Sequence, residues 1–525
     1  MTAWLVLPIG LPLLTAVLAL LVPARQRTQR VLGVAGSAGQ LIAAAGLLLA
    51  VRSEGILVLQ VGDWQAPFGI TLVGDHFSAL ILLAGSTAGF ASMVFAAMTV
   101  DAERTARGYF GFTGVLLAGV AGAFLTGDLF NLFVWFEVML IASFVLLALG
   151  PDRRQAEGAT TYVTLNLLAS ATFLLGCGLA YAITGSLNFA DIAQRLPDVE
   201  QRPLVLALSV LLLVAFATKA AAFPFASWLP ASYHTPAPDV SALFAGLLTK
   251  VGVYAVARSV TLFAPDDQMV HTAVMALAGF TMVIGVLGAL AQYEIRRLLS
   301  FHIASQVGYM LMGIGLMTPL ALAGAAFYMA QHMVTKTSLF LVSGVIERST
   351  GTGWLPNLGG LYRSQPALAA TFAVAALALA GIPPLAGFVA KYTLTRAAFE
   401  SEAWVLAGIA LAVSLLTLLS MAKIWTEAFW KDSPPAFAWR DPDEREDDPT
   451  EDATPGVPRR RIGRAVLLPA AALALVSASM GFAAGPLMEV ALLAGEGLAD
   501  TTPYLEAVLA GSGTGDSTGV GEGMP

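Results

Sequence analysis

The succession of long apolar segments is the feature that most constrains what this chain can fold into. A helix needs about 20 apolar residues to cross the ~30 Å hydrocarbon core of a bilayer. Fourteen segments of about this length follow one another along the sequence. Lipid offers no hydrogen-bond partner to the backbone, so each spanning segment must be helical. The sequence therefore predicts an all-α membrane protein with about 14 transmembrane helices.

The predicted spans have approximate bounds only. They run over residues 2–22, 30–51, 73–99, 109–125, 127–149, 158–184, 203–231, 239–263, 268–292, 301–317, 319–346, 366–400, 404–430 and 464–493.

The small share of charged residues supports this class of protein. Only 12% of the residues are charged and 57% are hydrophobic, whereas a soluble globular domain carries about 25% charged residues. A chain of this composition cannot cover a water-facing surface. It also has no basic patch of the kind that neutralises phosphates, so we expect no nucleic-acid partner.

The distribution of basic residues predicts the orientation. If the N-terminus lies outside, the odd-numbered loops hold 18 of the 28 basic residues, and the even-numbered loops hold only Arg52, Arg195 and Arg202. Cytoplasmic loops carry the excess of lysine and arginine. We therefore expect a multi-pass protein of the bacterial cell membrane with both termini outside.

Prolines interrupt two of the predicted spans. Pro224 falls in the seventh span, within FPFASWLP, and Pro383 and Pro384 fall in the twelfth, within AGIPPLAGF. Proline removes an internal hydrogen bond and clashes with the preceding turn. Two breaks that lie five spans apart suggest two repeated five-helix units, spans 4–8 and 9–13, in inverted orientation. Repeats with discontinuous helices are a transporter design in which the ion site lies near the breaks.

The resulting organisation has six parts. We expect N-terminal spans at 1–108, a first five-helix repeat at 109–263, a second at 268–430, a charged cytoplasmic loop at 431–463, span 14 and a C-terminal segment at 464–510, and a disordered tail at 511–525.

Lysine is used sparingly and inside the membrane. The chain has only six lysines against 22 arginines, and Lys219, Lys250, Lys336 and Lys391 all fall within predicted spans. A desolvated lysine can release its proton near neutral pH, whereas arginine stays charged. A proton relay needs a group of the first kind.

Glu137 lies near the centre of the fifth span. A charge at mid-bilayer costs on the order of 3 kcal/mol on insertion scales. These buried charges are therefore expected to face the interior of the helix bundle, either paired or hydrated. A structural Glu–Lys pair is the alternative, although such a pair is often no more stabilising than an apolar replacement.

Histidine and tyrosine add a polar stripe. Tyr328, His332 and Lys336 follow one another at four-residue spacing, which places them on one helix face. Histidine titrates in the range that proton transfer needs. The preceding span carries the pairs His302/Gln306 and Ser305/Tyr309 at the same spacing.

Four further residues have evenly matched functional and structural interpretations. His234 and Asp239 could form a proton-uptake site at the junction of spans 7 and 8, or Asp239 could be the N-cap of span 8. His302 could belong to the relay or be a packing residue. Lys423, near the end of span 13, could simply extend its ammonium to the membrane interface.

Three motifs resemble a known family. They are FPFASWLPASYHTPAPDVSALFAGLLTKVGVYA at 223–255, GDLFNLFVWFEVM at 127–139 and RRLLSFHIASQVGYM at 296–310. They are similar to the antiporter-like subunits of respiratory complex I and of Mrp-type multisubunit Na⁺/H⁺ antiporters. The pair Phe301–His302 resembles the D-type subunit of the Mrp antiporters, and the resemblance covers about residues 70–430.

The resemblance implies a proton path along the membrane plane. In this family Glu137 and Lys219 match the glutamate–lysine pair, Lys250 the central lysine and Lys391 the terminal ionisable residue, with His332 and Lys336 between them. It also implies partners: a large A-type subunit and small B-, C-, E-, F- and G-type subunits, in a complex that exchanges protons for Na⁺ or another monovalent cation.

The sequence leaves alternatives open. The chain could be a proton-pumping subunit of complex I or of a membrane-bound hydrogenase, or a non-conducting structural subunit. We expect no enzymatic activity, because no nucleophile–base pair occurs. We expect no metal or other cofactor either, because the single cysteine, Cys177, lies in an apolar stretch.

Overall fold

The computed structural model describes residues 2–22, 25–150, 152–432 and 463–510. The predicted charged loop at 431–463 and the tail at 511–525 therefore lie almost wholly outside the described residues.

Long helices make up nearly all of the described chain. The first half contains α1 (Ala3–Leu20), α2 (Gln26–Glu54), β1 (Leu57–Gln60), β2 (Thr71–Gly74), α3 (His76–Thr99), α4 (Ala102–Ala106), α5 (Tyr109–Leu125), α6 (Leu129–Ala148), α7 (Arg153–Thr184), α8 (Phe189–Arg195), α9 (Arg202–Ala220), α10 (Trp228–Ser232) and α11 (Pro238–Phe263). The second half contains α12 (Gln268–Leu290), α13 (Ile295–Leu316), α14 (Pro319–Thr350), α15 (Leu361–Ser364), α16 (Pro366–Ala380), α17 (Ala386–Glu400), α18 (Trp404–Ile424), α19 (Leu468–Phe482), α20 (Ala484–Ala499) and α21 (Thr502–Leu509).

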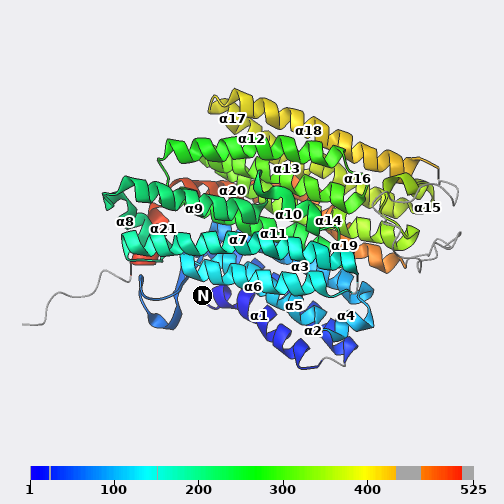
Figure 1. The fold of residues 1–525 in the computed structure, drawn as a ribbon, viewed down its shortest axis with the longest axis horizontal. Coiled ribbons are helices and arrows are strands. Elements are labelled where there is room, and N and C mark those ends of the chain that lie inside the picture. Colours follow the sequence, from blue (N-terminus) through cyan, green and yellow to red (C-terminus); the bar gives the residue numbers. More distant parts are fainter. Residues whose placement is uncertain (1, 23–24, 151, 433–462, 511–525) are drawn as a thin grey trace, which may run out of the picture.

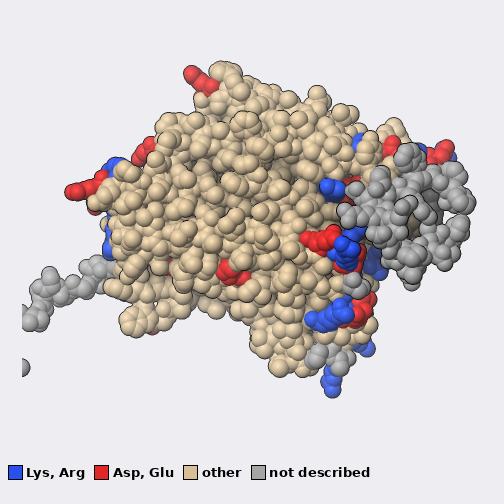
Figure 2. Space-filling view, viewed as in Figure 1, with Lys and Arg blue, Asp and Glu red and all other residues tan. Residues whose placement is uncertain are grey.

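The long helices run side by side in one bundle (Figure 1). The N-terminal pair α1 and α2 lies at one edge, α17 and α18 lie at the opposite edge, and α11 and α14 lie between them. Lysine, arginine and acidic side chains gather at the ends of the helices, and the broad face between these ends is almost free of them (Figure 2). This is the distribution that a bilayer requires.

Eleven helices are long and apolar enough to cross a membrane, and two shorter apolar helices, at Tyr109–Leu125 and Pro366–Ala380, accompany them. The predicted all-α membrane fold is therefore confirmed, whereas the count of fourteen spans stays a prediction. α14 is too polar to count as apolar by composition, yet it runs through the middle of the bundle and its residues from Ala321 to Ile346 are buried. A helix that is shielded by its neighbours can carry more polar residues than one that faces lipid.

Both proline-containing spans are interrupted, as the sequence predicts. α9 ends at Ala220, and Ala221 adopts a left-handed conformation with φ of 57° before α10 begins. α16 ends at Ala380, and Gly381 takes the same role with φ of 88° before α17. In each case the second residue after the helix donates a hydrogen bond five residues back: Ala222 to Ala217 at 2.9 Å and Ile382 to Leu377 at 3.1 Å. The two breaks therefore share one local geometry.

Some features were not expected from the sequence. β1 and β2 pair as an antiparallel hairpin between α2 and α3. The fourteenth span is divided at Ala483 into α19 and α20, and both parts pack along α14.

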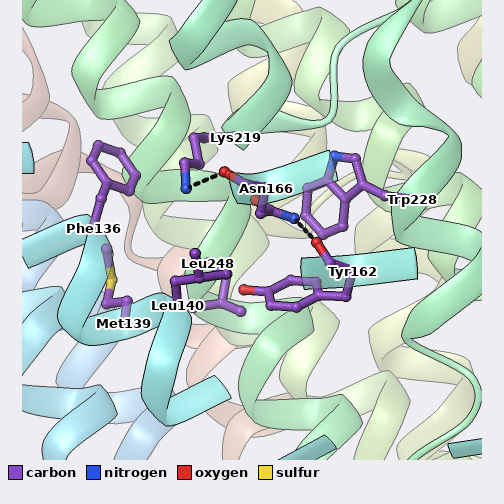
Figure 3. A pocket seen from close by; sticks show the side chains of 8 residues that line it. All are labelled: Phe136, Met139, Leu140, Tyr162, Asn166, Lys219, Trp228 and Leu248. Carbon is purple, nitrogen blue, oxygen red and sulfur yellow. Dashed lines mark hydrogen bonds between the residues drawn. The ribbon is translucent and has the colours of Figure 1, made fainter. Parts of the chain in front are cut away.

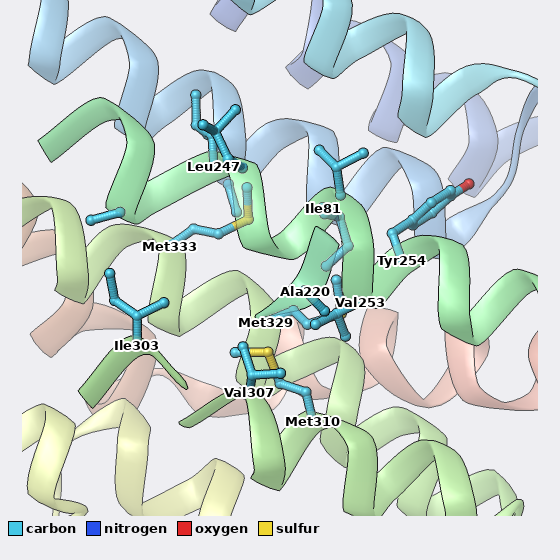
Figure 4. Close-up of a cluster of buried hydrophobic side chains, with 14 of the residues drawn as sticks. Ile81, Ala220, Leu247, Val253, Tyr254, Ile303, Val307, Met310, Met329 and Met333 are labelled. Atoms are coloured by element: carbon cyan, nitrogen blue, oxygen red, sulfur yellow. The ribbon is translucent and has the colours of Figure 1, made fainter. Parts of the chain in front are cut away.

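The centre of the bundle is an apolar cluster. Figure 4 shows Leu247 and Val253 of α11 beside Met329 and Met333 of α14, with Ile303 of α13 completing the contact. This packing fixes α11, α13 and α14 against one another, and these are the helices that carry the central lysine and histidine side chains. A rigid apolar frame leaves those side chains few alternative partners, which is what a defined proton path requires.

Candidate functional site

Lys219 lies at the end of α9, directly before the first helix break. Its side chain is 6% exposed, and its ammonium donates hydrogen bonds to the carbonyl of Asn166 at 3.1 Å and to the hydroxyl of Ser170 at 2.9 Å, both on α7. The ring of Phe136 on α6 lies 5.4 Å from Nζ. Figure 3 shows Lys219 pointing toward Asn166 beside a small cavity that Tyr162 and Trp228 also line.

Close packing of α11 holds this end of α9 in place. A Cβ atom at Gly252 would lie 2.4 Å from the backbone nitrogen of Ala220 and 2.6 Å from the carbonyl carbon of Lys219. Only glycine permits this approach. Lys250 lies two residues earlier on the same helix, so the contact that places α9 also relates Lys219 to the central lysine.

The central lysines are fully buried and bind neutral oxygen atoms. Lys250 donates to the carbonyl of Ala245 at 2.5 Å, and Lys336 donates to that of Leu299 at 3.0 Å. Neither has a carboxylate oxygen within 4.0 Å among the residues that the structure describes. Ammonium groups in such surroundings pay a desolvation cost without an opposite charge to offset it.

His332 lies one turn from Lys336 on α14. The side chain is fully buried, and neither ring nitrogen has a hydrogen-bond partner in the described part of the chain. The ring packs on that of Tyr328 at 6.0 Å, and the Tyr328 hydroxyl bonds with Gln306 of α13. Buried polar groups normally find partners, and ordered water supplies them where protein does not. The predicted polar stripe is therefore buried and has unused hydrogen-bonding capacity.

Lys391 lies on α17, after the second break. Its ammonium donates to the last carbonyl of α16, that of Ala380, at 3.0 Å and to the Ser414 hydroxyl at 3.2 Å. The ring of Tyr309 lies 4.9 Å away. The negative end of the α16 dipole favours a cation here. The first break thus follows its lysine, and the second break precedes its lysine.

Glu137 differs from the expectation that it faces the bundle interior. It is half-buried on the side of α6 that also exposes Val134 and Ile141. Figure 2 shows one acidic patch over α6 on the otherwise uncharged face, and Glu137 is the only acidic residue of α6. Its Oε1 is buried and has no hydrogen-bond partner among the described residues. In the same part of the chain, no carboxylate oxygen lies within 4.0 Å of the Lys219 ammonium, so the expected pair is separated here.

Comparisons with known proteins were decisive for the family. The model of the NADH:quinone oxidoreductase/Mrp antiporter transmembrane family matches residues 126–417. The chain belongs to this family. The match contains Glu137 and the buried lysines and histidine described above.

Curated relatives match over nearly the whole chain. The D-type subunit of the Na⁺/H⁺ antiporter of Alkalihalophilus pseudofirmus is 44% identical and covers 96% of this chain and 99% of its own length. The corresponding D-type subunit of Bacillus subtilis is 36% identical, with 97% and 100% covered.

Solved structures agree. A chain of the Mrp complex from Dietzia sp. is 35% identical with a TM-score of 0.89, covering 97% of this chain and all of that one. A chain of an archaeal membrane-bound sulfane sulfur reductase is 25% identical with a TM-score of 0.87, covering 96% and 99%.

Four secondary candidates of this family member have defined positions. Asp239 is not the N-cap of α11, because the helix begins at Pro238 and Ala237 precedes it; Asp239 instead lies buried in the first turn. His302 bonds with Ser420 of α18 at 2.8 Å. Lys423 donates to the carbonyls of Leu290 and Gln292 at the end of α12, and so caps that helix rather than reaching into solvent.

His234 lies in the loop between α10 and α11, where Nδ1 bonds with the carbonyl of Pro230 at 2.9 Å. Burial, together with the guanidinium groups of Arg296 and Arg297, lowers the pKa of His234 to about 4. The imidazole is therefore neutral at physiological pH, which does not favour a proton-uptake role near neutrality.

The expected pair Ser305/Tyr309 does not share a face. Tyr309 donates to the carbonyl of Ala410 on α18, whereas Ser305 donates to that of Met282 on α12. The i, i+4 spacing alone placed them together, but the two side chains bond to helices on different sides of α13.

Two polar features were missed from the sequence. Arg258 is buried in α11 and pairs with Asp75, which caps α3, so arginine is not confined to loops. Tyr162, Asn166 and Ser170 follow one another at four-residue spacing on α7 and face Lys219. That spacing is readable in the sequence, but apolar neighbours conceal it.

Proposed function

We propose that this chain is the D-type membrane subunit of a multisubunit Na⁺/H⁺ antiporter and that it provides a proton path. The path runs through Glu137, Lys219, Lys250, His332, Lys336 and Lys391. One observation carries the proposal: four lysines and a histidine are buried in the bundle, and each lysine binds only neutral oxygens in the described part of the chain. Buried lysines of this kind exchange protons more readily than paired ones.

The helix breaks support the same path. Lys219 and Lys391 each lie at the end of a half-helix, where backbone carbonyls are free to bind a cation. Pro224, Pro383 and Pro384 produce these ends. The breaks thus give the first and last lysine of the path similar surroundings in the two halves of the molecule.

The partners follow from the relatives. We propose a large A-type subunit and small B-, C-, E-, F- and G-type subunits as neighbours, in the bacterial cell membrane, with both termini outside and the arginine-rich helix ends in the cytoplasm. A transporter subunit of this kind needs no cofactor of its own.

A redox-driven proton pump is the second candidate, because the sulfane sulfur reductase chain is an archaeal respiratory subunit with nearly the same fold. Partners distinguish the two functions. Co-purification with iron–sulfur subunits supports the pump, and a set of membrane subunits alone supports the antiporter.

Glu137→Ala and Lys219→Ala, each in the intact complex, test the proposal. Sodium-driven proton movement in everted vesicles is expected to fall at least ~10-fold in both variants, while the subunits still co-purify. Antiport near the wild-type rate with normal assembly would contradict a proton path through this pair.

A further inference from the structure

The hydroxyl of Ser170 differs from the other hydroxyl groups of α7. Thr160, Thr164 and Thr172 each donate to the carbonyl four residues earlier in their own helix, at 2.9, 2.9 and 3.0 Å. This is the usual arrangement for threonine and serine in helices. Ser170 instead accepts from Lys219 of α9 at 2.9 Å, and it is 3% exposed.

Lys219 and Glu137 are separated although each would bind the other strongly. Glu137 is close enough for its charge to act on the ammonium, and its Oε1 is buried without a partner in the described residues. Hydrogen bonds between ionised groups are roughly twice as strong as neutral ones. The ammonium nevertheless lies on two neutral oxygens of α7.

The space around Lys219 permits movement between these positions. The cavity beside the lysine is about 20 Å³ and is lined by Phe136 of α6 and by Tyr162 and Asn166 of α7 (Figure 3). A volume of about 10–15 Å³ is enough for one water molecule. Phe136 adjoins Glu137 in the chain, so the cavity lies between the two helices that offer partners to the ammonium.

We propose that Ser170 and the Asn166 carbonyl form a second binding position for the Lys219 ammonium, which holds it after it has left Glu137. We call these two oxygens the α7 site. The inference rests on the proposed function and deepens it, because it names where the lysine goes when the glutamate–lysine pair opens. Ser170 is then a positioning residue that acts through Lys219.

The α7 site sets how easily the lysine gives up its proton. The titratable groups that face Lys219 are Glu137 from α6, Tyr162 from α7 and Lys250 from α11. An ammonium beside a carboxylate keeps its proton to a higher pH than one that is held by neutral oxygens. Occupation of the α7 site therefore favours release of the proton toward the central lysine.

Ser170→Ala in the intact complex tests the α7 site. A hydrogen bond to a charged group contributes roughly 1.5–3 kcal/mol, so we expect the maximal antiport rate to fall about tenfold. The lysine would spend more time on Glu137, and the pH profile of antiport should move at least ~0.5 pH units toward alkaline pH. Thr172→Ala, which removes a hydroxyl that bonds within its own helix, should change neither quantity.

Two results would overturn the inference. One is a Ser170→Ala complex with the wild-type rate and pH profile. The other is a lower rate at every pH with an unmoved profile, as a structural effect alone would give. Alanine differs from serine by one oxygen, so the complex should assemble, and co-purification of the subunits checks this. If Glu137→Ala and Lys219→Ala abolish antiport while Ser170→Ala is silent, only the α7 site fails.

Discussion

The choice between lysine and arginine separates transport from structure in this molecule. The buried lysines bind single carbonyls or hydroxyls, which leaves their protons exchangeable. The buried arginine, Arg258, instead pairs with Asp75 and packs on the rings of Phe77, Tyr254 and Tyr504. That set of contacts fixes α11 to α3 and to the C-terminal helix α21. Arginine keeps its charge under all physiological conditions, so it suits a fixed connection and not a relay.

His234 provides a pH-dependent test at the residue scale. Its folded-state pKa of about 4 lies below the ordinary value of 6.5, because burial and nearby arginines disfavour the imidazolium. The stability that this group contributes is therefore complete above pH 6.5 and is lost as the pH falls toward 4. At pH 5 the loss amounts to about 2 kcal/mol.

We expect His234→Asn, which can still donate to the Pro230 carbonyl, to remove this loss. The purified variant complex should melt at a higher temperature than wild type at pH 5 and at nearly the same temperature at pH 8. Antiport at neutral pH should stay within about twofold of wild type. A variant that melts alike at both pH values relative to wild type, or that loses antiport, would show that the imidazole takes up protons near neutrality.

At the scale of elements, the breaks and the glycines around them position the lysines. Gly381 has a positive φ, and a Cβ atom there would lie 2.8 Å from Cδ of Lys391. Gly252 allows α11 to touch the end of α9 at Lys219. Each break therefore depends on a residue without a side chain, in one case within the break and in the other on the neighbouring helix.

Gly252→Ala is expected to push α9 and α11 apart, because the new Cβ would meet backbone atoms at 2.4–2.7 Å. Overpacking of this kind costs about 1–3 kcal/mol. We expect antiport in vesicles to fall at least ~5-fold and the melting temperature of the complex to decrease. Gly178→Ala on α7, where a Cβ would meet nothing within 4 Å, is the matched control and should leave both unchanged. Equal behaviour of the two variants would show that this contact does not position Lys219.

The elements also show what the sequence could and could not predict. The breaks were predicted because proline cannot continue a helix, and the buried lysines because charge stands out in apolar segments. The β1–β2 hairpin was missed because its strands have only four residues each. The orientation of Glu137 could not be predicted, because α6 is apolar on every side and its periodicity does not reveal which face is covered. Partner choice by Ser170 depends on tertiary contacts that spacing does not encode.

At the scale of the whole molecule, charged helix ends enclose a band without charges on the surface, and the ionisable line lies within that band (Figure 2). The line extends from α6 and α9 through α11 and α14 to α17, that is, across the bundle from one half to the other (Figure 1). Insertion of these lysines costs on the order of 3 kcal/mol each. The apolar frame around α11, α13 and α14 offsets this cost and keeps lipid away from them.

The central claim is that this line conducts protons, and replacement of Lys250 tests it most directly. Methionine fills the space of the lysine stem without a titratable group, so Lys250→Met should preserve or raise the melting temperature of the complex. Lys423→Met is the control, because Lys423 caps α12 at the edge of the bundle. In everted vesicles we predict that sodium-driven proton movement falls at least ~10-fold in Lys250→Met and stays near wild type in Lys423→Met. An assembled Lys250→Met complex with wild-type antiport would contradict the account.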